Sequence, residues 1–226
     1  MHISLGEPHN EKEQEFIKGH DGDYAVQAVA NGYCALTLEQ RCFGESGGVP
    51  EPDCYNTAML SIMLGRTLLG QRVWDIHRVI DVIEKHFSFI DQNKICCMGH
   101  SGGGTATFYA ACIDERIALA MSSGALCTFE KSIASIRHCA CNHVPNIAKY
   151  FDMGDLSGLI APRKLVMVSG NQDPIFPING AMETHSQICQ MFKYAGVQDH
   201  FSFVTGDGGH RFYADAWKTF NQLLKK

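Results

Sequence analysis

The chain has 226 residues, of which 45% are hydrophobic, and a formal net charge of −5. This length allows one sizeable core and favours a single domain over residues 1–226 rather than two. The net charge is slightly acidic, so the chain lacks the excess of basic residues that typically binds nucleic acid or acidic lipid. We therefore expect neither a nucleic-acid partner nor a membrane partner.

The first 24 residues are polar and charged, so they do not resemble a secretory signal peptide. No stretch approaches the roughly 18–20 apolar residues that a membrane helix needs. Several of the ten cysteines lie in apolar runs, such as Cys96 and Cys97. Thiols in such positions are typical of a reduced, buried state, which favours a cytoplasmic location.

Segments typical of helices and of strands alternate along the chain, which predicts a doubly wound, mostly parallel α/β sheet. The predicted strands are 33–38, 95–98, 118–122, 164–169 and 201–204. The predicted helices are 22–31, 57–69, 71–87, 103–113, 180–195 and 212–224. Residues 124–160 are long for a connection, and they are interpreted either as a lid or pocket wall or as a segment that merely covers the sheet.

The strongest motif is Gly-His-Ser-Gly-Gly-Gly at 99–104, between a predicted strand and a predicted helix. This is the setting in which G-x-S-x-G marks a nucleophile elbow, with Ser101 as the nucleophile. The Gly102 amide, at the start of the helix, is the expected oxyanion donor. A phosphate loop is disfavoured because the motif lacks both the Lys-Ser/Thr ending and the G-x-G-x-x-G spacing.

A serine nucleophile needs a general base, usually a histidine held by a carboxylate. His210 lies in a glycine-rich loop after the last predicted strand, where open α/β sheets assemble their sites. Asp173 follows the strand 164–169 and completes the order serine, acid, histidine. Asp199 and Asp207 compete as the acid, but the first precedes its strand and the second fits a turn beside His210.

Other polar residues are weaker candidates. Glu39, Gln40 and Arg41 follow the predicted strand 33–38, so they would border the pocket, and Arg41 could fix a polar substrate group. His100, beside the nucleophile, is a further candidate for substrate contact.

The segment from His138 to His143 holds four potential metal ligands in six residues. No second cysteine or histidine pair lies at zinc-finger spacing. We therefore predict no metal and no cofactor.

Three motifs together, GHSGGG, LIAPRKLVMVSGNQDPIFP and GGHRF, resemble bacterial α/β-hydrolase esterases related to acetyl xylan esterases, cephalosporin C deacetylases and dienelactone-hydrolase-like proteins. The resemblance runs from about residue 20 to the C-terminus. It implies the α/β-hydrolase fold and a triad at Ser101, Asp173 and His210. Dienelactone hydrolases use cysteine as the nucleophile, so the serine here favours ordinary esters.

The front of the chain departs from this group. Such folds place several strands and a His-Gly oxyanion loop before the strand assigned to 33–38, and no such features precede it here. The expectation is an α/β-hydrolase fold without its first strands, either because the chain starts inside a longer reading frame or because it is a minimal variant. The second oxyanion donor has no counterpart, and homodimerisation could cover the open sheet edge.

The predicted function is that of a serine carboxylesterase acting on small esters, acetyl esters foremost, with a small-molecule ester as the partner. A peptidase or amidase with the same triad is one alternative, and a weakly active or non-catalytic scaffold is another. A thioesterase or lipase is the third, although no long apolar lid is evident.

Overall fold

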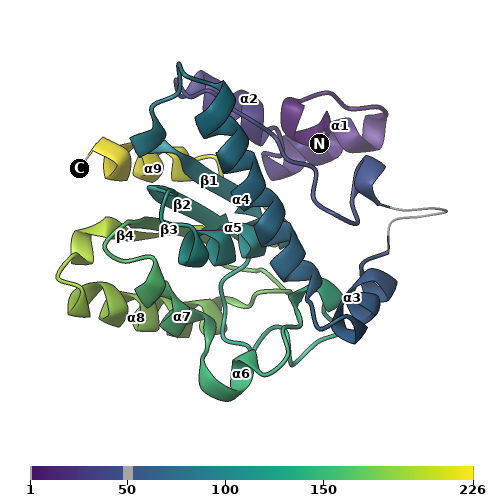
Figure 1. Cartoon of the computed structure of the whole chain (residues 1–226), viewed down its shortest axis with the longest axis vertical. Helices are drawn as coiled ribbons and strands as arrows, with labels where there is room; N and C mark the ends of the chain where they lie inside the picture. The colour runs from purple at the N-terminus through teal and green to yellow at the C-terminus, as the bar shows by residue number, and fades with distance from the viewer. Residues whose placement is uncertain (1, 48–52, 226) are drawn as a thin grey trace.

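The computed structural model describes residues 2–47 and 53–225, and its centre is a sheet of four parallel strands (Figure 1). The strands lie side by side in chain order: β1 (Cys96–His100), β2 (Leu119–Ser123), β3 (Lys164–Gly170) and β4 (Phe201–Gly206). Because all four run in the same direction, their carboxyl ends meet at one edge of the sheet. The four strands predicted from residue 95 onward are thus confirmed.

Nine α-helices lie in residues 2–47 and 53–225. They are α1 (Glu11–His20), α2 (Tyr24–Ala30), α3 (Cys54–Met63), α4 (Leu68–His86), α5 (Gly102–Ile113), α6 (Ile147–Tyr150), α7 (Met153–Leu156), α8 (Ile178–Tyr194) and α9 (Ala216–Lys225). None of the described helices combines the length and the apolar character needed to cross a bilayer.

Helices cover both faces of the sheet, as a doubly wound fold requires (Figure 1). Helices α4, α5 and α8 pack on one face around Ala120, Leu165 and Met167. Helix α9, with α2 beside it, packs on the other face around Met121 and Val166. Since successive strand residues point to opposite faces, the neighbouring cysteines of β1 contact different clusters, as the sequence predicts.

The strand predicted at 33–38 is wrong. Tyr33 to Leu38 form no ladder with any strand of the described chain, although their composition suits a strand. Tyr33 packs on α9 instead, where its hydroxyl donates to Asn221 at 2.5 Å and its ring lies against Trp217. Composition alone does not make a strand, because a strand is held by hydrogen bonds to a neighbour.

The break between the third and fourth helices also differs from the prediction. The chain leaves α3 at Leu64 and turns at Gly65, whose φ of +68° is in the left-handed region that glycine tolerates. Helix α4 then begins after Thr67, whose hydroxyl accepts a hydrogen bond from the Gly70 amide at 2.9 Å. Gly70 therefore lies inside the first turn of α4 and does not separate two helices.

Residues 124–160 connect β2 to β3 and contain α6, α7 and short 3₁₀ turns, including η4 (Ala140–Asn142). Much of the segment packs inward: Leu126 and Met153 are buried in the core on the α8 side of the sheet. Whether it also forms a lid or pocket wall stays a prediction.

Candidate active site

Ser101 occupies a sharp turn between β1 and α5. Its backbone has φ 55° and ψ −122°, a conformation that a non-glycine residue adopts only under strain. Its amide donates to Ser123 O at 2.8 Å, which fixes the turn to the neighbouring strand. The amide of Gly102 belongs to the first turn of α5, where the helix provides no acceptor for it.

Close backbone contacts explain the glycines around Ser101. A Cβ at Gly99 would lie 2.3 Å from Gly103 O, and one at Gly104 would lie 2.6 Å from Ser123 O. Any side chain at these positions would push β1, β2 and α5 apart. The glycines therefore let β1 and α5 pass closely, which is the backbone arrangement that a nucleophile elbow requires.

Asp173 and His210 are joined by a hydrogen bond. His210 Nδ1 lies 2.7 Å from Asp173 Oδ2, and the second carboxylate oxygen accepts from the amides of Ile175 and Phe176 at 2.8 and 3.0 Å. Asp173 is only 4% exposed. Burial alone would raise the pKa of this carboxyl, but the hydrogen bonds from His210 and from the two amides outweigh it and lower the pKa.

The loops that carry these two residues are tied together by their backbones. The amide of Asn171 donates to Gly206 O, and the amide of Gln172 donates to Gly208 O, both at 2.8 Å. Tyr213 closes the loop that carries His210, since its hydroxyl donates to Gly209 O at 2.9 Å. The pairing of β3 with β4 thus continues past the strand ends and fixes Asp173 against His210.

The imidazole of His210 lies close to the turn that carries Ser101. Its ring centre is 4.7 Å from that of His100, the residue before Ser101. The ring of Phe176 also stacks on it, with the ring centres 5.9 Å apart. No hydrogen bond joins Ser101 to His210 in residues 2–47 and 53–225; such contacts commonly tighten only when substrate binds.

His100 is a structural neighbour of the site. Its Nδ1 lies 3.1 Å from Ser123 Oγ, and its ring is largely buried. Burial, followed by the charge of His210, lowers the pKa of His100 to about 3, so the ring is neutral at neutral pH.

The three candidates at 39–41 lie in different places. Gln40 lies beside the elbow, because a Cβ on Gly103 would be 3.3 Å from its Nε2, and its Oε1 is buried without a described partner. Arg41 turns to α4 and forms a bidentate ion pair with Asp75, with N–O distances of 2.6 and 2.8 Å. Glu39 accepts from the amide of Glu45 at 2.9 Å, inside its own loop. Only Gln40 of the three is close to the elbow.

Arg72 was missed by the sequence analysis. It lies on α4, is 1% exposed, and donates through Nε and Nη2 to Arg41 O at 3.2 and 2.8 Å. Nη1 takes no part in these bonds and lies 3.8 Å from the position that a Cβ on Gly102 would occupy. A single arginine on an amphipathic helix gives no signal in the sequence, because long cationic side chains there are usually solvated.

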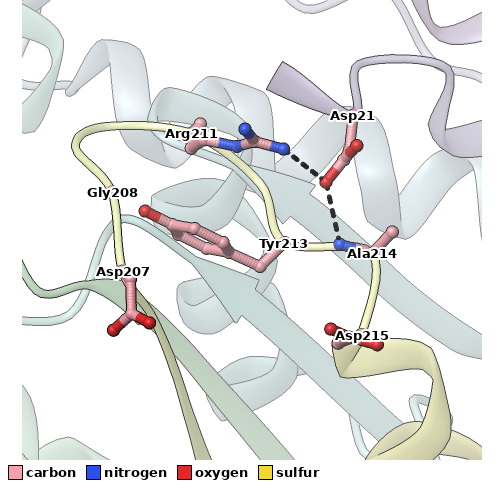
Figure 2. Close-up of a pocket in the computed structure, with 7 residues that line it drawn as sticks. All are labelled: Asp21, Asp207, Gly208, Arg211, Tyr213, Ala214 and Asp215. Carbon is pink, nitrogen blue, oxygen red and sulfur yellow. Dashed lines mark hydrogen bonds and ion pairs between the residues drawn. The ribbon is translucent and has the colours of Figure 1, made fainter. Parts of the chain in front are cut away.

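An open pocket lies beside the loop that carries His210, and neither Ser101, Asp173 nor His210 lines it (Figure 2). Figure 2 shows Asp21, from the end of α1, receiving hydrogen bonds from Arg211 Nη2 and the Ala214 amide, at 2.6 and 3.1 Å. These contacts anchor the segment after His210 to the front of the chain. We therefore do not take this pocket as the place where the reaction occurs; its contacts hold the segment after His210 in position.

Comparison with known proteins gives relatives of one kind. The family model for fungal glucuronyl esterases matches residues 66–128, which is less than half of the chain. A Bacillus subtilis protein named "Putative hydrolase YtaP" is 24% identical over 92% of this chain and 70% of its own length.

Solved structures are similar in fold. The Bacteroides fragilis protein described as a "putative acetyl xylan esterase" superposes with a TM-score of 0.75 at 17% identity, over 90% of this chain and 55% of that one. A glucuronoyl esterase from Teredinibacter turnerae gives a TM-score of 0.69 at 16% identity, over 100% of this chain and 63% of that one. The chain thus spans less than two thirds of these structures. The likeness shows the α/β-hydrolase fold, confirming the predicted fold class.

Proposed function

We propose that this protein is a serine carboxylic-ester hydrolase, with Ser101 as nucleophile, His210 as general base and Asp173 as the residue that orients the base. The observation that carries the proposal is one arrangement at one sheet edge. A strained elbow after β1 presents Ser101 at the start of α5. A hydrogen-bonded Asp173–His210 pair stands in the loops that follow β3 and β4. The comparisons support an esterase of this fold.

The reaction is acyl transfer in two steps. His210 takes the proton of Ser101 as Oγ attacks the ester carbonyl, and it returns that proton to the alcohol as the carbon–oxygen bond breaks. Water then gives a proton to His210 and attacks the acyl-enzyme, and His210 passes this proton to Ser101 Oγ as the acid leaves. Asp173, kept ionised by its hydrogen bonds, stabilises the imidazolium in both steps.

Two groups are candidates for stabilising the oxyanion. The Gly102 amide is the first, since it stands at the positive end of α5. Arg72 Nη1 is the second, because it borders Gly102 and is not used in holding Arg41 O. A buried guanidinium beside the elbow would supply the donor for which the sequence offers no counterpart.

Acetyl esters are the first substrate class, as the motifs suggest. Glucuronoyl esters are the second candidate, because the matching family model and several similar structures are glucuronoyl esterases. The two classes differ in the acyl part that the enzyme must hold beside Ser101.

A two-substrate assay tests both levels of the proposal. Turnover of p-nitrophenyl acetate and of a benzyl glucuronate ester is measured with the wild type, Ser101→Ala and the matched surface variant Ser135→Ala. We expect Ser101→Ala to abolish turnover of whichever ester is cleaved, with an unchanged melting temperature, because alanine keeps the same backbone strain. Ser135→Ala should match the wild type. Full activity of Ser101→Ala would overturn the proposal.

A further inference from the structure

Three thiols from distant parts of the chain converge beside α4. Cys54 opens α3, while Cys139 and Cys141 lie before and inside η4. Their Sγ atoms all lie within 4.8 Å of one another, and those of Cys139 and Cys141 are 3.1 Å apart. All three are free thiols. Sulfur is the softest protein ligand and suits thiophilic metals such as Zn²⁺.

The thiol cluster consists of Cys54, Cys139 and Cys141. Its burial suits a metal site that is accessible from one side. Cys141 is 3% exposed and packs with Cys42 and Leu68 in a small apolar cluster, and Cys54 is half-buried against it. Cys139 is exposed. An ion can therefore reach the sulfurs from the solvent side, while the other two ligands are held by packing.

A buried cation adjoins the thiol cluster. Arg72 Nη2 donates to Cys54 Sγ at 3.3 Å, and no carboxylate in the described residues contacts this guanidinium. A charge buried without an opposite charge is costly, so Arg72 favours the thiolate form of its neighbours. Three thiolates carry three negative charges; one divalent ion together with Arg72 neutralises them, whereas a monovalent ion would leave one unbalanced.

We propose that Cys54, Cys139 and Cys141 bind one divalent thiophilic ion of the Zn²⁺ class, with Arg72 as the charge-balancing neighbour. Zinc–sulfur bonds of about 2.3 Å in tetrahedral geometry place sulfurs about 3.8 Å apart. One present separation is 3.1 Å and none exceeds 4.8 Å, so side-chain rotations can bring the sulfurs to that spacing. The ion would join α3 to the loop at 139–141. It would also fix Cys54, the thiolate that accepts from Nη2 of Arg72, and Nη1 of the same guanidinium borders Gly102.

Metal binding is measured directly, without using activity. Protein reduced with a phosphine under anaerobic conditions is loaded with Zn²⁺, passed through gel filtration and analysed for metal. A Co²⁺-loaded sample is examined for thiolate-to-cobalt charge-transfer absorption. We expect one equivalent of Zn²⁺ per chain and a clear charge-transfer band.

Two ligand variants and one control sharpen the result. Cys139→Ser, at an exposed position, should leave folding intact yet weaken Zn²⁺ binding about 100-fold or more, and Cys54→Ser should do the same. Cys189→Ser, an exposed thiol on α8, should bind like the wild type. The proposal is overturned if the reduced wild type retains no metal, if Cys139→Ser binds as well as the wild type, or if the thiols form a disulfide and the reduced protein binds nothing. Because activity is not measured, these outcomes are independent of the proposed hydrolase function.

Discussion

The two sides of the candidate site are built in different ways. Asp173 and His210 stand on loops that continue the β3–β4 pairing, with backbone hydrogen bonds beyond the strand ends. The front segment, residues 33–47, pairs with no strand of the described chain and is held by side chains, chiefly Arg72 on Arg41 O and Arg41 on Asp75. The sheet therefore fixes Asp173 and His210, whereas α4 fixes the front of the candidate site.

The exposure of apolar residues follows the same division. Leu165 on β3 is 0% exposed, while Leu36 and Leu38 of the front segment are 52% and 38% exposed. Apolar residues that find no partner contribute little to stability. The comparison thus predicts large effects from changes at the strand ends and in the core, and small effects from the front.

The largest effect is expected at Asp173. Asp173→Asn would keep the shape but leave His210 in the wrong tautomer or orientation, and it should lower kcat about 10⁴-fold with little change in KM. Steady-state kinetics on the ester identified as substrate measure this. A loss of less than tenfold would show that the sheet-held pair is not the base and its orienting acid.

The same variant tests the pH dependence of stability. The folded-state pKa of Asp173 is lowered, so its contribution is present above the unfolded value of about 3.9 and is lost as the pH falls through the folded value. Below about pH 4, the free energy of unfolding measured with denaturant should therefore fall less steeply with pH in Asp173→Asn than in the wild type. If the free energy of unfolding fell equally with pH in the two proteins, the hydrogen bonds assigned to the Asp173 carboxylate would be contradicted.

A matched pair of leucine truncations tests the comparison by stability alone. Leu165→Ala should lower the free energy of unfolding by about 2–5 kcal/mol, because it opens a cavity between the sheet and its helices. Leu36→Ala should change it by about 0.5 kcal/mol or less. Urea unfolding measures both. Equal losses would mean that the front segment is packed as firmly as the sheet.

Arg72 links the front segment to the elbow, because it donates to Arg41 O and its Nη1 borders Gly102, so its loss should act on the reaction. Arg72→Met keeps much of the buried stem but removes the donors, and we expect a kcat about 10²–10³-fold lower. Arg41→Met, which breaks the exposed pair with Asp75, serves as the control and should change kcat only a few-fold. The assignment of Arg72 as an oxyanion donor would be wrong if both variants behaved alike.

A small effect on stability is expected in the loop that carries His210. Tyr213→Phe removes the hydrogen bond to Gly209 O and should cost about 0.5–1.5 kcal/mol of stability. The ring still packs on Gly206, so the loop should keep its path. Thermal unfolding and kcat are the readouts, and a kcat that falls more than tenfold would show that the hydroxyl does more than close the loop.

Much of the sheet was predictable because its strands carry their own signals. Short, largely apolar segments ending close to a glycine correspond to β1 to β4, and the motif at 99–104 placed Ser101 between a strand and a helix. Asp173 and His210 were predictable because strand ends in a parallel sheet share one edge. Residues 33–38 were not, since their composition suits a strand but pairing depends on a neighbour that local sequence does not reveal.

Contacts between distant segments were also beyond the sequence. Arg72 reaches the elbow only because α4 packs against α5, and the sequence around residue 72 does not predict this packing. The cysteines at 139 and 141 lacked a partner at zinc-finger spacing, and Cys54 joins them only in the folded chain. Such groupings depend on tertiary packing, which spacing rules do not capture.

The most direct test of the central claim is labelling with a fluorophosphonate, which phosphonylates a serine only where a neighbouring base activates it. After digestion, mass spectrometry locates the adduct. The account predicts stoichiometric modification of Ser101 in the wild type, with labelling at least 100-fold slower in folded His210→Ala, by analogy with losing the base in other triads. An unlabelled wild-type protein, an adduct on another serine, or equal labelling of the His210 variant would contradict it.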